Sequence, residues 1–246
     1  MAAVPAAIET RQLTRRFRRT EAIRDLSFSV PDGSICALLG PNGAGKTTTI
    51  KLLMNLLRPS DGVASVLGRD SRRLDAAALQ RIGYVSENQR LPDWMTPGQL
   101  FDYCRPLYPG WDPALARTLQ AMLGLTESRP LRQLSRGTRM KAALLASLAF
   151  RPALLILDEP FTGLDPVVRD DLIEALLKPP GGRPWTILVS SHDMHEVERL
   201  ADRVVFIEGG RLLLEEPVAS LLARFPSRSL RDVFVELARG AAKGSR

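Results

Sequence analysis

A glycine-rich segment that ends in lysine and threonine is the first place where residue types and spacing indicate chemistry. Residues 40–47 read GPNGAGKT and match the phosphate-loop pattern G-x-x-x-x-G-K-[S/T]. The glycines let successive backbone N–H groups turn toward an anion, and the start of a following helix adds partial positive charge. Lys46 can reach the outer phosphates of a nucleotide, and the Thr47 hydroxyl can bind Mg²⁺. The residues predicted to hold the nucleotide here are Gly40, Pro41, Asn42, Gly43, Ala44, Gly45, Lys46, Thr47 and Thr48.

Two adjacent carboxylates follow an apolar stretch further along the chain. Residues 154–157 read LLIL and run directly into Asp158 and Glu159. Desolvating neighbouring acids is expensive unless a cation or a proton donor uses them. Asp158 is therefore expected on the Mg²⁺ side of the phosphates. Glu159 is expected to orient or deprotonate the attacking water.

The elements that must position these residues have two kinds of pattern. Continuous apolar runs such as 153–157 predict a parallel sheet that is covered on both faces. The N-terminal runs alternate between apolar and polar residues, which predicts an antiparallel portion. Strands are predicted at 8–14, 26–30, 34–39, 63–67, 82–85, 153–157, 185–190 and 204–207, and helices at 46–57, 97–107, 113–123, 138–150, 166–177, 193–201 and 217–223. The polar, helical pattern between Asn88 and Arg136 indicates an inserted helical subdomain.

Composition excludes several classes of protein. The 246 residues are 45% hydrophobic and 25% charged, which is typical of a globular chain and not of a disordered or collagen-like one. The longest nearly apolar run, 142–150, is far shorter than the about 20 residues of a spanning helix. No basic residue precedes Arg11, so the start makes a poor signal peptide. Cys36 and Cys104 lie in apolar surroundings, which favours a reducing compartment, although their pairing stays open.

The net charge of +7 fits nucleic acid, an anionic membrane surface or a polyphosphate ligand, and does not choose among them. The densest basic cluster, Arg15, Arg16, Arg18 and Arg19, favours a solvated strand end over a binding patch.

Three further motifs, in order, carry a family resemblance. Residues 134–138 read LSRGT before a helix, residues 162–165 read TGLD after the acidic pair, and His192 follows the next strand. Together with the phosphate loop, this series resembles the ATP-binding-cassette (ABC) ATPases, and more closely the single-cassette ATP-binding subunits of exporter-like transporters. The resemblance covers about residues 7–223.

The resemblance implies an α/β fold with a P-loop NTPase (RecA-like) core, a mainly parallel sheet, an N-terminal antiparallel β portion and an inserted helical subdomain at about 88–150. The ATPase domain is expected over 1–225 and a short C-terminal helix and tail over 226–246. In that tail Leu230, Val233, Phe234 and Leu237 share one helical face, which favours docking on the chain's own domain over contact with a partner.

The resemblance also implies roles for single residues. Phe17 lies where the family has an aromatic that stacks on adenine, with core packing as the alternative. Ser135 and Gly137 would contact the γ-phosphate of ATP held by the other subunit of a head-to-tail dimer, and His192 would contact the γ-phosphate in its own subunit. Asp165 would help to connect the two sites. His195 lies near His192, but no third metal ligand is close in sequence.

Two further residues follow His192. Asp193 is expected to be the N-cap of the next helix, with Glu196 three residues on.

The chain departs from the family pattern at three positions. Arg136 replaces the first signature glycine and Thr138 replaces the glutamine, which leaves the rate of hydrolysis open. The family glutamine that follows residues 82–85 is displaced, so either Glu87 or Gln89 would reach Mg²⁺ or couple to the partner, with Glu87 favoured.

The sequence thus predicts an ATP- and Mg²⁺-dependent ATPase subunit that powers an ABC exporter. It would form a homodimer or heterodimer and would contact integral membrane permease subunits through the segment near 88–133. It would lie in the cytoplasm, peripheral on the inner face of the cell membrane. A soluble ABC-type ATPase that acts on nucleic acid is the alternative, although such proteins carry long coiled coils between phosphate loop and signature. A small-molecule P-loop kinase would leave the signature, Asp165 and His192 unexplained.

Overall fold

The computed structural model describes residues 5–126, 128–225 and 229–236. Its contacts divide the chain into two compact units. We call Met1–Leu74 with Thr186–Arg246 the phosphate-loop unit, and Asp75–Trp185 the helical unit.

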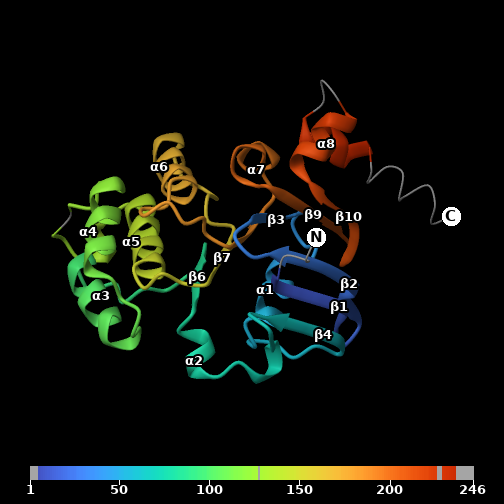
Figure 1. The fold of residues 1–246 in the computed structure, drawn as a ribbon, viewed down its shortest axis with the longest axis horizontal. Coiled ribbons are helices and arrows are strands. Elements are labelled where there is room, and N and C mark those ends of the chain that lie inside the picture. The colour runs from blue at the N-terminus through green and yellow to red at the C-terminus, as the bar shows by residue number, and fades with distance from the viewer. Residues whose placement is uncertain (1–4, 127, 226–228, 237–246) are drawn as a thin grey trace. The chain divides into compact units, whose positions relative to one another are not determined.

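The phosphate-loop unit contains a four-stranded antiparallel sheet (Figure 1). Its strands, in the order β2-β1-β4-β5, are β2 (Thr20–Pro31), β1 (Ala6–Phe17), β4 (Asp61–Val66) and β5 (Arg69–Asp70). Leu13 of β1 faces Leu26 of β2 and both are fully buried. This sheet confirms the predicted antiparallel portion.

The same unit holds the parallel strands that lead to the phosphate loop. β3 (Ile35–Leu39) lies between β8 (Ile187–Ser191) and β9 (Arg203–Glu208), parallel to both, and every residue of β3 and β8 is buried. β10 (Arg211–Pro217) pairs antiparallel with β9. The helices are α1 (Lys46–Leu53), α7 (Met194–Leu200) and α8 (Val218–Arg224), with a 3₁₀ turn η1 (Ser71–Arg73).

The helical unit is built around α5 (Arg136–Leu148). This helix packs on β6 (Ile82–Ser86) and on three helices, α3 (Pro97–Cys104), α4 (Pro113–Met122) and α6 (Pro166–Leu177). β6 pairs in parallel with β7 (Leu154–Asp158), whose residues are all buried. The remaining elements are α2 (Ala76–Leu79), η2 (Arg105–Leu107) and η3 (Leu131–Gln133). The mainly parallel α/β fold with a helical portion is the fold class that the sequence predicts.

Several helix boundaries differ from the prediction, and two of them have a clear local cause. α1 ends at Leu53 rather than at residue 57, because Asn55 takes a left-handed conformation with φ 57°. The amides of Leu56 and Asn55 then donate to the carbonyls of Lys51 and Leu52, which closes the helix as a Schellman motif. α5 begins at Arg136 rather than at residue 138, since Ser135 caps it.

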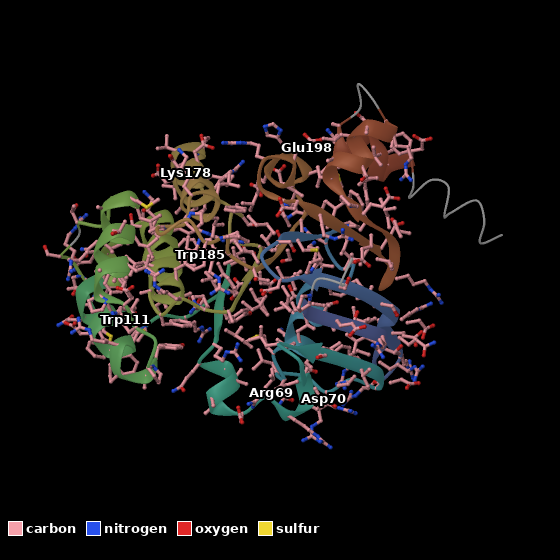
Figure 2. All side chains as sticks on the ribbon, viewed as in Figure 1. Arg69, Asp70, Trp111, Lys178, Trp185 and Glu198 are labelled. Atoms are coloured by element: carbon pink, nitrogen blue, oxygen red, sulfur yellow. The ribbon has the colours of Figure 1, made fainter. Side chains whose placement is uncertain are left out.

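The C-terminal stripe packs on its own unit, as favoured above. Residues 230–236 are helical, and Leu230 and Val233 are fully buried. The Phe234 ring lies 5.3 Å from that of Phe206 on β9. Glu198 on α7, labelled in Figure 2, accepts a hydrogen bond from the Leu230 amide. The fourth residue of the stripe, Leu237, lies outside the described residues.

Two findings bear on the compositional expectations. Within the described ranges, no helix is both long and apolar enough to span a membrane. Cys36 and Cys104 are free thiols, and burial raises the pKa of the Cys36 thiol to about 12. The predicted boundaries at 88–150, 225 and 226 stay predictions.

Candidate functional site

The phosphate loop starts where β3 ends and stops where α1 begins. Gly45 is the N-cap of α1 with φ 109°, a conformation that favours glycine. A Cβ added there would lie 2.5 Å from Ile23 Cδ1 and 2.8 Å from the Ala22 carbonyl oxygen, so only glycine fits this close approach. Asn42 and Gly43 are exposed, which leaves the loop open to a ligand.

Lys46 is the charged group of this loop. Its side chain is only 5% exposed, and Nζ donates to the carbonyl oxygens of Gly40 at 2.7 Å and Pro41 at 3.2 Å. The loop's own carbonyls thus hold the ammonium group against the loop, beside the first turn of α1 that carries Thr47 and Thr48. Backbone amides and a cation at a helix start suit a polyphosphate.

His192 follows β8 at the same edge of the sheet. In the parallel pairing Leu39 of β3 is opposite Ser191 of β8, so the phosphate loop and His192 leave neighbouring strands at their carboxyl ends. Ligands of open α/β sheets bind at such edges. The His192 side chain is exposed.

Hydrogen bonds fix the backbone on either side of His192. The predicted N-cap is confirmed, because the Asp193 carboxylate accepts from the His195 amide at 3.0 Å. The Asp193 amide itself donates to Ser191 Oγ at 2.9 Å. Ser191 Oγ in turn donates to Glu196 at 3.2 Å, so Glu196 supports this turn through Ser191.

Phe17 ends β1 and is 39% exposed, which does not fit the core-packing alternative. The Arg15 guanidinium carbon lies 4.5 Å from the centre of its ring, a cation–π distance. Sequence reasoning missed this role of Arg15, because β1 has register shifts between residues 13 and 16 that break the alternation of strand faces.

In the helical unit, the acidic pair follows β7. Ser86 of β6 is opposite Asp158 of β7, and the Glu87 amide donates to the Asp158 carbonyl at 2.9 Å. The loops after both strands therefore leave from one edge. Asp158 is buried. Burial of the nearby Tyr84 phenol raises its pKa, and the Asp158 charge raises it further.

Glu159 has a backbone conformation that few side chains adopt. Its φ is 52°, in the left-handed region that is unfavourable for a residue with a Cβ by roughly 1–2 kcal/mol. Thr162 Oγ1 donates to Glu159 Oε2 at 3.2 Å. Strain of this kind clusters at functional sites, where the surroundings hold it.

The signature residues form the first turn of α5. Ser135 is the N-cap, and its Oγ accepts from the Thr138 amide at 3.1 Å and lies 2.9 Å from the Thr138 hydroxyl. A Cβ added at Gly137 would lie 2.9 Å from Val168 Cγ1 on α6, so packing demands glycine here. Asp165 caps α6 by accepting from the Val168 amide at 3.0 Å.

The structure brings together two of the family departures. Arg136 Nη2 donates to Glu87 Oε1 at 2.8 Å across 49 positions of sequence. Gln89 Oε1 accepts instead from the Ser86 amide at 3.4 Å. Sequence reasoning treated Arg136 and Glu87 as separate, and the opposite charges were the only signal that could have joined them.

These two residues line a groove of about 620 Å³ in the helical unit. The groove lies among the loop after β6, η3 and α5. Its charged residues are Glu87, Asp93, Arg90, Arg132, Arg136 and Arg139.

The predicted site residues are thus divided between the units. Phe17, the phosphate loop and His192 belong to the phosphate-loop unit, and the acidic pair and the signature belong to the helical unit. Within the described residues, no group of three or more His, Cys, Asp or Glu side chains forms a metal cluster.

Comparison with known proteins gives consistent matches. A family model described as ABC transporter matches residues 23–162. The ABC transporter ATP-binding protein YtrB of Bacillus subtilis (strain 168) is 33% identical over 205 residues, covering 83% of this chain and 70% of that protein. The daunorubicin/doxorubicin resistance ATP-binding protein DrrA of Streptomyces peucetius is 34% identical over 239 residues, covering 92% and 69%. A solved structure of an ATP-binding subunit of an ABC transporter has a TM-score of 0.83 at 27% identity, covering 94% of this chain and 99% of that one.

Proposed function

The chain belongs to the ABC transporter family as an ATP-binding subunit, and on that premise we propose that it hydrolyses ATP to drive an exporter. The observation that carries the proposal is the phosphate loop, in which Lys46 is buried and held by carbonyls at the start of α1. Similarity to the Nod factor export ATP-binding protein I of Burkholderia orbicola (strain AU 1054), 38% identical over 217 residues, supports export as the direction. The nucleic-acid alternative finds no support among the matches.

ATP would be held mainly by the phosphate-loop unit. The loop amides and Lys46 would bind the phosphates, with Lys46 exchanging the carbonyls of Gly40 and Pro41 for phosphate oxygens. Adenine would stack on the face of Phe17 opposite Arg15. His192 would contact the γ-phosphate from the neighbouring strand end.

Magnesium fits the donors that the chain offers. The Thr47 hydroxyl and the Asp158 carboxylate are hard oxygen ligands of the kind Mg²⁺ prefers, and a buried carboxylate such as Asp158 favours a cationic partner. Glu87 or Gln89 would add an oxygen ligand from the loop after β6. The ion would neutralise negative charge on the phosphates during hydrolysis.

Glu159 would act as the general base. It would take a proton from the attacking water while the bond between the γ-phosphorus and its bridging oxygen breaks, giving ADP and phosphate. The hydrogen bond from Thr162 to one carboxylate oxygen would orient the other toward the water. The strained backbone would hold the side chain in this position.

A second subunit would complete each site. Ser135 and Gly137, at the start of α5, would bind the γ-phosphate held by the partner in a head-to-tail homodimer or heterodimer. Asp165, which caps α6 next to Gly137, would link the two sites.

The membrane partner would contact the helical unit. Trp94, Tyr103 and Leu107 are large apolar side chains that lie about half exposed there, and Asp93, next to Trp94, lines the groove described above. Large exposed apolar residues often mark interaction surfaces. We infer that permease subunits bind here and hold the protein at the cytoplasmic face of the cell membrane.

The Glu159→Gln variant tests the proposal. It keeps the size of the side chain but cannot accept the proton, so single-turnover hydrolysis should fall about 10²–10⁴-fold. ATP binding should persist, and size-exclusion chromatography with Mg-ATP should show an accumulated dimer.

The matched control is Glu174→Gln, the same change at an exposed glutamate of α6. It should hydrolyse ATP at the parental rate. A Glu159→Gln protein with the parental rate would remove the general-base role, and one that binds no ATP would make Glu159 structural.

A further inference from the structure

The ion pair between Arg136 and Glu87 joins three segments that are distant in sequence. Arg136 is the first residue of α5, and Glu87 is the first residue after β6. The Arg136 guanidinium also lies beside Gly163, where an added Cβ would be 3.4 Å from Nη1. One side chain thus pairs with the loop after β6 and lies beside the loop between the acidic pair and α6.

The position of Arg136 is electrostatically unfavourable for the helix itself. A cation in the first turn opposes the positive end of the helix dipole. The Glu87 carboxylate lies 2.8 Å from the guanidinium, and its negative charge offsets the unfavourable interaction of Arg136 with the helix dipole. This happens at the helix start that carries Ser135 and Gly137.

The same groove offers a comparison for this arginine. Arg132 also lines it and is exposed, yet among the residues that the structure describes its side chain has no ion pair or hydrogen bond. The groove is therefore not uniformly paired, and the contact to Glu87 is particular to Arg136.

We propose that Arg136 is a positioning residue that ties the loop after β6 to the start of α5 through Glu87. The inference rests on the proposed function, because it assigns the pair a role in ATP hydrolysis. The pair holds the Glu87–Gln89 loop in one register against the signature turn, so that motion of the groove and motion of the signature occur together. Arg136 and Glu87, two of the departures from the family pattern, then act together as one positioning pair.

We call the link that the Arg136–Glu87 pair forms between the loop after β6 and the start of α5 the tether. Amide hydrogen exchange tests it without a measurement of ATPase activity. The amides of Glu87 and Gln89 donate to the carbonyls of Asp158 and Ser86, and their exchange reports opening of the loop. Arg136→Gln and Glu87→Gln should each speed exchange at Gln89 about two- to fivefold, the range expected for a half-exposed ion pair. The double variant should exchange no faster than either single one, whereas Arg132→Gln should leave the rate unchanged.

Steady-state kinetics test the role in hydrolysis. Arg136→Gln and Glu87→Gln should each lower kcat about two- to fivefold with an unchanged KM, with no further loss in the double variant. Arg136→Lys should recover most of kcat, because it restores the charge, and Arg132→Gln should match the wild type.

The outcomes separate the two proposals. Losses of kcat that add up in the double variant would overturn the tether. Exchange at the Gln89 amide that is unchanged by both substitutions would overturn it as well. Faster exchange with unchanged kcat would overturn the positioning role. A wild-type protein that hydrolyses no ATP would refute the proposed function, while the exchange cycle would still decide whether the tether exists.

Discussion

At the scale of single residues, the candidate site holds its cations in place by neighbouring groups. The Lys46 ammonium lies on two carbonyls, the Arg136 guanidinium on Glu87, and the Arg15 guanidinium on the Phe17 ring. Polar groups that are already oriented need little rearrangement when a charged ligand binds.

Phe17 gives a prediction at this scale. Phe17→Ala should weaken ATP binding about fivefold or more, since loss of aromatic stacking is worth roughly 1 kcal/mol. Titration with a fluorescent adenine nucleotide measures the effect. Val63→Ala is the control, because Val63 is a similarly exposed apolar residue of the same sheet. Lower stability with unchanged affinity would argue against adenine stacking.

At the scale of elements, the first turns of α5 and α6 pack together too closely for a side chain at residue 137. The Val168 methyl groups lie where a Cβ on Gly137 would go, and Asp165 caps the helix that carries Val168. The signature glycine therefore has a packing role beside the proposed contact with phosphate.

The two roles can be separated by rescue. Gly137→Ala should destabilise the fold by about 1–3 kcal/mol through overpacking, and Val168→Ala in the same chain should restore most of this. Gly98→Ala is the control, because nothing but Thr96 Oγ1 lies within 4 Å of a Cβ at that position. Thermal unfolding measures stability. If Gly137 also binds phosphate, the rescued double variant should regain stability but not hydrolysis; recovery of both would leave packing as its whole role.

At the scale of the whole molecule, the proposed chemistry requires residues of two subunits. Lys46 would act on the ATP of its own subunit and Ser135 on the ATP of its partner. A symmetric dimer then has two equivalent sites, each built from both chains.

Mixing two inactive variants tests this sharing. Lys46→Ala and Ser135→Ala should each hydrolyse little ATP alone. An equal mixture should recover about a quarter of the wild-type rate, because half of the dimers are mixed and each contains one intact site. Mass spectrometry of the dimers verifies the mixing. Mixed dimers that remain inactive would exclude shared sites.

A feature could be predicted from the sequence when the residues that determine it lie close together along the chain. The strand, phosphate loop and start of α1 follow one another in sequence, so their pattern indicated both structure and chemistry. Strand β10 is not among the predicted strands, although the Gly209-Gly210 pair was a local signal for it. Both glycines have positive φ, as a tight hairpin turn requires. The pair of Arg136 and Glu87 had only opposite charges 49 positions apart, because their proximity depends on how β6 and α5 pack.

If Glu159 is the general base proposed above, its left-handed backbone sets the stability of the fold against hydrolysis at one position. Glycine would relieve a strain of roughly 1–2 kcal/mol there, but it would also remove the carboxylate. On the proposed role of Glu159 as general base, selection for hydrolysis would retain glutamate at this position. In a lineage where one cassette of a mixed pair no longer needs to turn over ATP, residue 159 should drift toward glycine, asparagine or aspartate, which tolerate this conformation best. The residue at position 159 would then indicate which cassette of an evolving pair still hydrolyses ATP.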